Sequence, residues 1–294
     1  MKLLSREVIS HNTEYAQSYI NQRQHDWNSN KSFDKCLLLI ALGALCLSAL
    51  LYSIGGLHTG FFSLQYAGLN FLPTVAWANI TFTGDTVVAL SIVLVFSYRF
   101  PHLALAVFVS AIIGTLCIQS MKHLIDNPRP PSVLAADTFN LIGPALKRNS
   151  TPSGHTATAF ILAALLTRCV SSNITKLIIV FAAVLVGWSR VVCGVHWPVD
   201  VCLGASLGLV SAYIGLRLSD NISLKLLPYL LTSTLLLGTA IYLFNYDGDF
   251  SETALPAKIL SATSVFYWLL LWSQALRIKP NAQRKPNSPL KTKH

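Results

Sequence analysis

Three short segments of the sequence carry residues of the kinds that bind phosphate. The first segment holds Lys122 and Arg129, and the third holds Arg190. An arginine guanidinium presents a planar fork of N–H donors that matches phosphate oxygens, and a lysine adds a compact positive charge. In the second segment, Ser153 suits the N-cap of a helix, and Gly154 lets an anion approach the free backbone N–H groups that follow. Together these five residues predict a phosphate cradle.

Two histidines and one carboxylate accompany this cradle. His155 falls in the first turn of the helix that Ser153 would cap. Pro198 suits a first helical position, so Trp197 becomes the N-cap and Asp200 the third residue. A carboxylate there points back toward His196, holding one imidazole nitrogen and leaving the other free to attack.

Such a set is the minimum for phosphoryl transfer through a phosphohistidine. One histidine serves as the nucleophile and the second as the general acid. No acidic cluster of the metal-binding type accompanies these segments, so we expect a mechanism that needs no metal and no cofactor.

The elements that must position these residues are membrane helices. The chain has 294 residues, of which 53% are hydrophobic and 12% charged, against about 25% charged in an ordinary soluble domain. This composition excludes disorder and argues against a soluble domain. Long uncharged runs are typical of transmembrane helices, and the sequence predicts an all-α integral membrane protein. Eight hydrophobic segments are expected, at residues 36–57, 84–98, 101–121, 155–167, 177–189, 201–216, 226–244 and 259–275. The fourth looks short.

The distribution of basic residues predicts the topology. If the connecting segments alternate between the two sides, beginning inside, sixteen of the 22 Lys and Arg residues lie inside. The six outside are Lys122, Arg129, Lys147, Arg148, Arg190 and Lys258. The positive-inside rule therefore places both termini in the cytoplasm and all three motifs on the outer side. The net charge of +10 would suggest a nucleic-acid partner in a soluble protein, but here the charges flank membrane segments and we expect none.

Two further regions have simpler interpretations. The aromatic-rich stretch 55–83 suggests a segment that lies in the membrane interface. The six cysteines form no CxxC pair and are interpreted as small buried hydrophobic residues, although a bond between Cys193 and Cys202 stays open.

Each site residue also has a purely structural explanation. Lys122 would serve as a snorkelling anchor, Ser153 as a plain cap, and Arg190 as an exception to the charge rule. All of these explanations would have to hold together, on the side of the membrane where positive charge is disfavoured. The interpretation as a site is therefore preferred.

Taken together, the three segments resemble the type 2 phosphatidic acid phosphatase (PAP2) superfamily, whose signature reads KxxxxxxRP, PSGH and SRxxxxxHxxxD. Every signature position has its match here: Lys122, Arg129, Pro130, Pro152, Ser153, Gly154, His155, Ser189, Arg190, His196 and Asp200. The resemblance implies His196 as the nucleophile, Asp200 as its orienting partner and His155 as the acid for the leaving oxygen. It implies that Lys122, Arg129, Ser153, Gly154 and Arg190 hold the phosphoryl group.

The resemblance also implies a fold and a substrate. The family's six-helix transmembrane core would span residues 36–218, after a polar cytoplasmic segment 1–35. Residues 219–278 would add a two-helix extension, and residues 279–294 a basic cytoplasmic tail. The expected protein is a bacterial inner-membrane lipid phosphatase whose site faces the periplasm or exterior. Its substrate would be undecaprenyl diphosphate, phosphatidylglycerophosphate, phosphatidate or lipid A.

Three alternatives stay open. The first is a phosphotransferase that passes the phosphoryl group from His196 to a lipid acceptor. The second is a non-catalytic phospholipid carrier, and the third is a phosphatase for a soluble substrate of the glucose-6-phosphatase kind. Lys147 and Arg148 would read a second phosphate in a diphosphate substrate, or else are solvated loop charges.

Overall fold

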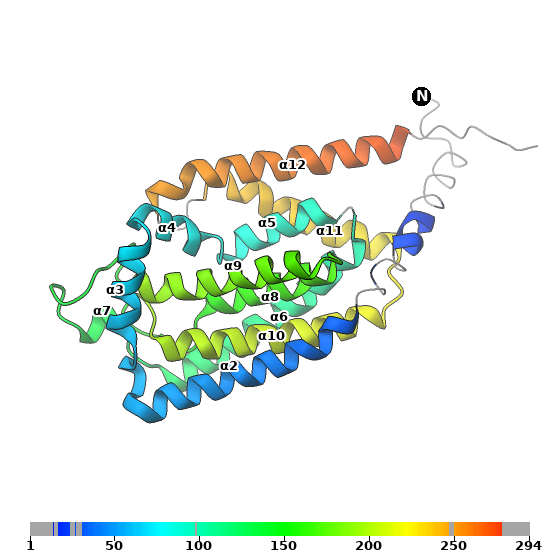
Figure 1. Ribbon diagram of the computed structural model, residues 1–294. Coiled ribbons are helices and arrows are strands. Elements are labelled where there is room, and N and C mark those ends of the chain that lie inside the picture. The colour runs from blue at the N-terminus through cyan, green and yellow to red at the C-terminus, as the bar shows by residue number, and fades with distance from the viewer. Residues whose placement is uncertain are drawn as a thin grey trace, which may run out of the picture.

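The structure is a computed structural model that describes residues 14, 17–23, 27, 31–97, 99–246 and 250–277. Every regular element within these residues is a helix (Figure 1). The longer helices are α2 (Asp34–Gly55), α3 (Phe61–Phe71), α5 (Thr86–Ser97), α6 (Pro101–Ile125), α8 (Gly154–Arg168), α9 (Asn173–Val192), α10 (Pro198–Asp220), α11 (Leu226–Leu243) and α12 (Ala254–Arg277). The shorter ones are η2 (Lys31–Phe33), η3 (Gly56–His58), α4 (Thr74–Phe82), α7 (Pro130–Val133) and η4 (Ser251–Thr253). The predicted tail 279–294 and most of the polar segment 1–35 lie outside the described residues.

All eight predicted hydrophobic segments form helices, so the all-helical membrane fold is confirmed. In the described chain, five helices are long and apolar enough to cross a membrane, or six if α4 and α5, bent by 64°, form one broken span. This is fewer than the eight crossings expected. Helix α8 has 15 residues and measures about 22 Å, whereas a hydrocarbon core is about 30 Å thick. The boundary at residue 218, between the six-helix core and the two-helix extension, stays a prediction.

The outward faces of the long helices are apolar. Leu39, Ile54 and Leu177 expose 71%, 68% and 69% of their surface. Large apolar side chains exposed in such number mark a surface that contacts lipid rather than water. This surface agrees with the membrane helices that the sequence predicts.

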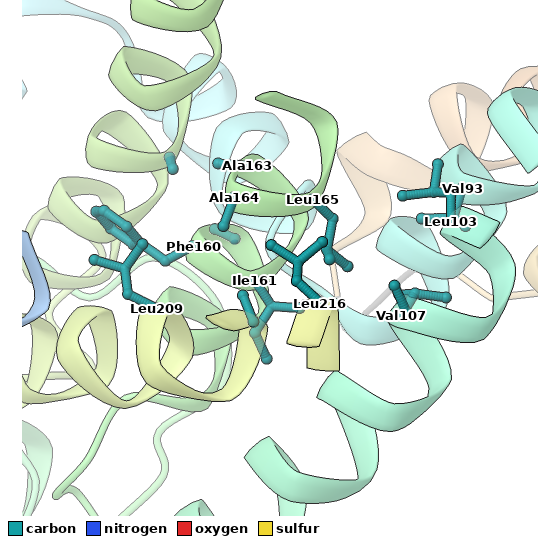
Figure 2. Packing of buried hydrophobic residues seen from close by; sticks show 14 of the residues in the cluster. Val93, Leu103, Val107, Phe160, Ile161, Ala163, Ala164, Leu165, Leu209 and Leu216 are labelled. Carbon is teal, nitrogen blue, oxygen red and sulfur yellow. The ribbon is translucent and has the colours of Figure 1, made fainter. Parts of the chain in front are cut away.

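Helix α8 lies in the interior of the bundle, and α10 packs directly against it. Figure 2 shows Phe160 of α8 near Leu209 of α10, and Ile161 of α8 near Leu216 of α10, in a cluster that also holds Leu103 and Val107 of α6. Glycines allow the close approach: a Cβ on Gly204 would lie 2.4 Å from the carbonyl oxygen of Ser153. Small residues at such positions let helix backbones touch in membranes. The contact fixes the beginning of α8 beside the beginning of α10.

The stretch 55–83 forms η3, α3 and α4, and α3 lies across one end of the bundle (Figure 1). Its aromatic residues divide into two groups. Tyr66 and Phe71 are exposed, whereas Phe61 and Trp77 are completely buried. Phe61 packs within the protein against Trp197, with ring centroids 5.0 Å apart, and the placement of this segment in the membrane interface stays a prediction.

A buried ion cluster closes the other end of the bundle. Arg168, at the end of α8, pairs with Asp34 at 2.6 Å and with Asp220 at 2.9 Å. Lys31 also reaches Asp220, at 3.2 Å. The cluster joins the ends of α2, α8 and α10, and its opposite charges compensate one another where water is excluded.

The two helices of the predicted C-terminal extension, α11 and α12, pack along α5. Tyr229 on α11 donates to the carbonyl of Ser97 at 3.3 Å, and Ser264 on α12 donates to the carbonyl of Ser91 at 3.2 Å. Helices α11 and α12 thus hold α5, which forms one wall of the cavity described below. All six cysteines are free thiols, so the bond left open between Cys193 and Cys202 is absent.

Candidate active site

The three predicted segments meet at the end of the bundle that α3 crosses (Figure 1). Lys122 lies in the last turn of α6, and Arg129 lies on the extended stretch between α6 and α7. Ser153 begins α8, Arg190 ends α9, and His196 lies in the loop before α10. Residues separated by up to 74 positions are thereby gathered at one site.

His196 and Asp200 form the expected pair. Trp197 is the N-cap of α10 and Pro198 its first residue, as the sequence predicts. The Oδ2 atom of Asp200 accepts from the Trp197 backbone N–H at 2.9 Å and lies 3.3 Å from Nδ1 of His196. The helix cap therefore orients the carboxylate, and the carboxylate orients the imidazole.

Two hydroxyl groups that sequence reasoning missed complete the surroundings of Asp200. Ser150 donates to Oδ2 and Thr151 to Oδ1, each at 2.5 Å. The carboxylate of Asp200 has no exposed surface. These hydroxyl donors take the place of the water that it would contact in solution, and they stabilise its ionised form. The only signal in the sequence was their position, directly before Pro152.

Arg129 lies next to the second ring nitrogen of His196, the one that does not face Asp200. Its Nη1 atom is 3.3 Å from Nε2 of His196 and donates to the carbonyl of Val195 at 3.2 Å. Its Nε atom donates to the carbonyl of Arg148 at 2.9 Å. Backbone carbonyls thus hold the guanidinium beside the nitrogen that the predicted mechanism requires for attack.

The surroundings of His196 favour its neutral form. Its side chain is 2% exposed. Burial, together with the positive charges of Arg129, Arg190 and Lys122, holds the pKa of His196 well below its usual value. A neutral imidazole retains the lone pair that a nucleophile needs.

Arg190 is also buried, with 5% of its surface exposed. Its Nη1 atom donates to the hydroxyl of Thr81 on α4 at 2.5 Å, a partner that the sequence did not predict. Its Nε atom has no hydrogen-bond partner among the described residues. A buried guanidinium with an unpaired donor is well suited to bind an anion.

The beginning of α8 has the geometry expected of an anion site. Ser153 caps the helix, because its Oγ accepts from the backbone N–H of Thr156 at 3.4 Å and from the Thr156 hydroxyl at 2.9 Å. A Cβ on Gly154 would meet only the side chain of Ile118, at 4.0 Å. The backbone at Gly154 therefore borders open space, where an anion reaches the helix N-terminus.

This open space is a cavity of about 170 Å³ between α5, α6 and α8. Gly154 and the half-buried His155 line it. Apolar side chains of all three helices, among them Leu90, Val107 and Leu162, form much of the remaining wall. A cavity that joins an anion site to apolar walls suits an amphiphile.

The loop charges Lys147 and Arg148 do not reach into this cavity. Arg148 pairs with Asp126 and has a side chain that is 75% exposed, and Lys147 is exposed as well. The backbone of these residues contributes instead, since the carbonyl of Lys147 accepts from the backbone N–H of Arg129 at 3.0 Å. Of the two interpretations, the structure favours solvated loop charges.

The metal-free character of the site stays a prediction. Within the described ranges, no group of three or more His, Cys, Asp or Glu side chains has the arrangement of a metal site. The site's polar side chains are mainly cationic and suit an anionic substrate.

Comparison with known proteins places these motifs in a family. The sequence model of the PAP2 superfamily matches residues 103–223, a range that contains all three segments. Among solved structures, the crystal structure of Aquifex aeolicus LpxE matches with 32% identity, covering 50% of this chain and 87% of the other, with a TM-score of 0.45. A search of curated proteins found no match. On the strength of the matching sequence, this chain belongs to the PAP2 superfamily.

Proposed function

We propose that this protein removes a phosphoryl group from a membrane lipid through a phosphohistidine on His196, without a metal ion. The observation that carries the proposal is the buried His196–Asp200 pair, with Nδ1 at 3.3 Å from the carboxylate and Nε2 beside the guanidinium of Arg129. A histidine held in this way presents one nitrogen as a nucleophile in the middle of an anion site.

In the first step, the lone pair of His196 Nε2 attacks phosphorus and forms a P–N bond. The bond between phosphorus and the lipid oxygen breaks, and its electron pair stays on that oxygen. The imidazolium of His155 donates a proton there, so the lipid leaves as a neutral alcohol, or as a monophosphate from a diphosphate. Arg129, Arg190, Lys122 and the N-terminus of α8 stabilise the charge of the transferring group.

In the second step, His155, now neutral, removes a proton from a water molecule. The water oxygen attacks phosphorus, the P–N bond breaks, and its electron pair returns to His196. Inorganic phosphate is released, and the protonation states of both histidines are restored. Asp200 stabilises the positive imidazole ring of the intermediate in both steps.

The cavity supports a lipid substrate. Its apolar walls begin beside His155 and lie between helices that contact lipid. A soluble phosphate ester would leave these walls in contact with water, which is unfavourable. We further propose, from the distribution of basic residues, that both termini are cytoplasmic and that the site faces the outer side of a bacterial inner membrane.

Phosphate release from phosphatidate, phosphatidylglycerophosphate, lipid A and undecaprenyl diphosphate tests the proposal, in detergent with EDTA. We expect release from at least one lipid and its loss in His196→Ala. His123→Ala is the matched control, because His123 is exposed on the last turn of α6. A strict requirement for added Mg²⁺ would overturn the metal-free mechanism.

Rapid acid-free quenching with a labelled substrate tests the intermediate. We expect a transient phosphoenzyme that is labile to acid, and none in His196→Ala. If the phosphoenzyme forms but phosphate appears only when a lipid alcohol is added, the protein is a phosphotransferase. Lipid binding without any turnover would indicate a carrier.

A further inference from the structure

Asp85 is one of the residues that line the same cavity. It lies at the turn between α4 and α5, where its Oδ1 accepts from the backbone N–H of Val87 at 2.7 Å. Its Oδ2 accepts from the hydroxyl of Tyr246, which follows α11 in the predicted extension, at 2.8 Å. Asp85 thus caps α5 and also lines the cavity.

Asp85 and His155 are held close together. The residue before Asp85 is Gly84, on which a Cβ would lie 3.1 Å from the carbonyl oxygen of His155 and 3.3 Å from its Cβ. The turn that carries Asp85 therefore rests directly on the first turn of α8. In the proposed mechanism His155 protonates the leaving oxygen of the lipid. The head group bonded to that oxygen would therefore lie close to the turn that carries Asp85.

The charge in the cavity is negative on the side of α5. The cavity is lined by Asp85 and by the polar residues Thr86, Thr115, Gln119 and Thr158, and no Lys or Arg lines it in the part of the chain that the structure describes. A carboxylate only accepts hydrogen bonds. It stabilises a neighbouring hydroxyl or amide N–H and repels a second phosphate.

We propose that Asp85 selects lipids in which a hydrogen-bond donor stands next to the scissile phosphate. This inference rests on the proposed function and names its substrate class: phosphomonoesters of a glycerol or sugar head group that carries a hydroxyl or amide. A polyprenyl diphosphate fits poorly, because its leaving group is an anionic monophosphate without a donor. Tyr246 holds Asp85 in place, which gives the extension a role in specificity.

The ratio of kcat/KM for two lipid substrates tests this inference. Phosphatidylglycerophosphate and lipid A have leaving groups with donors, of the glycerol and sugar kind respectively, whereas the diacylglycerol released from phosphatidate has none beside the ester. Asp85→Asn keeps the size of the side chain and a residue suited to cap α5. We expect it to reduce the ratio of the preferred donor-bearing lipid to phosphatidate about tenfold, as expected for one hydrogen bond to a charged group. Tyr246→Phe should reduce the ratio by a smaller factor, about threefold.

Asp137→Asn is the matched control, because Asp137 is an exposed residue of the loop after α7; we expect it to leave both rates as they are. Equal losses for both lipids in Asp85→Asn would indicate a structural role and overturn the inference. A wild-type preference for undecaprenyl diphosphate would also overturn it while leaving the proposed function intact. Absence of turnover with every lipid would instead count against the proposed function itself.

Discussion

The replacement Asp200→Asn removes one negative charge and little else. An asparagine carbonyl in place of Oδ2 still accepts from the backbone N–H of Trp197 and from Nδ1 of His196. Its amide group then faces the hydroxyl of Thr151, an oxygen that already accepts from Asn127 at 2.9 Å and has room for a second donor. We therefore expect the fold and the orientation of His196 to survive.

The loss in rate follows from the distance between the charges. In the proposed mechanism the imidazole ring becomes positive when His196 bonds to phosphorus, and the carboxylate oxygen lies 3.3 Å from its Nδ1. At an effective dielectric constant of about 20, this attraction is worth about 5 kcal/mol. Loss of the charge should therefore reduce kcat between about 10³- and 10⁴-fold.

The assay is phosphate release with the preferred lipid in detergent and EDTA, together with the amount of phosphoenzyme. Thr151→Ser is the matched control, because it keeps the hydroxyl that donates to Oδ1 and should stay within about threefold of the wild type. If Asp200→Asn folds and retains kcat within tenfold of the wild type, the carboxylate does not stabilise a charged ring, and the reasoning is refuted.

Two further changes follow from the same structure. The pKa of His196 lies below its usual value because of burial and the nearby cations, and the proposed mechanism needs its neutral form; the loss of kcat/KM that protonation of His196 causes on the acid side should therefore lie below about pH 6.5. An acid-side decline centred above pH 6.5 in a pH–rate profile would contradict this. Arg168→Met removes the arginine that Asp34 and Asp220 share and leaves Asp220 with Lys31 alone as a cationic partner among the described residues; it should lower the free energy of unfolding by about 3–5 kcal/mol. Lys31→Met, whose side chain is 38% exposed, should cost less than about 1 kcal/mol in the same denaturation experiment, and equal effects of the two changes would disprove the difference.

Local patterns were sufficient for much of the fold and of the candidate site. The hydrophobic segments became helices because a membrane requires each backbone polar group to be bonded within its own segment. The caps at Ser153 and Trp197 were predictable for a similar reason, since a cap depends on residues only three positions apart. The orientation of Asp200 toward His196 belongs to this class.

The remaining contacts join residues that are distant in the sequence. Ser150 and Thr151 reach Asp200 across about fifty positions, Thr81 reaches Arg190 across 109, and Tyr246 reaches Asp85 across 161. No periodicity or spacing encodes such pairs, because they depend on how closely the helices pack.

The sequence by itself determined that the chain is helical and membrane-embedded, and it supplied the cationic and histidine residues that make a phosphate site plausible. It did so because hydropathy, capping and residue chemistry act over a single turn or a single span. Only the tertiary structure decided which groups surround those residues. The approach of α10 to α8 at Gly204 sets Asp200 beside Ser153, whose N–H donates to the Asp200 carbonyl at 3.0 Å. The packing of α11 and α12 on α5 likewise places a carboxylate in the cavity, since side-chain positions across helices are fixed by packing rather than by local sequence.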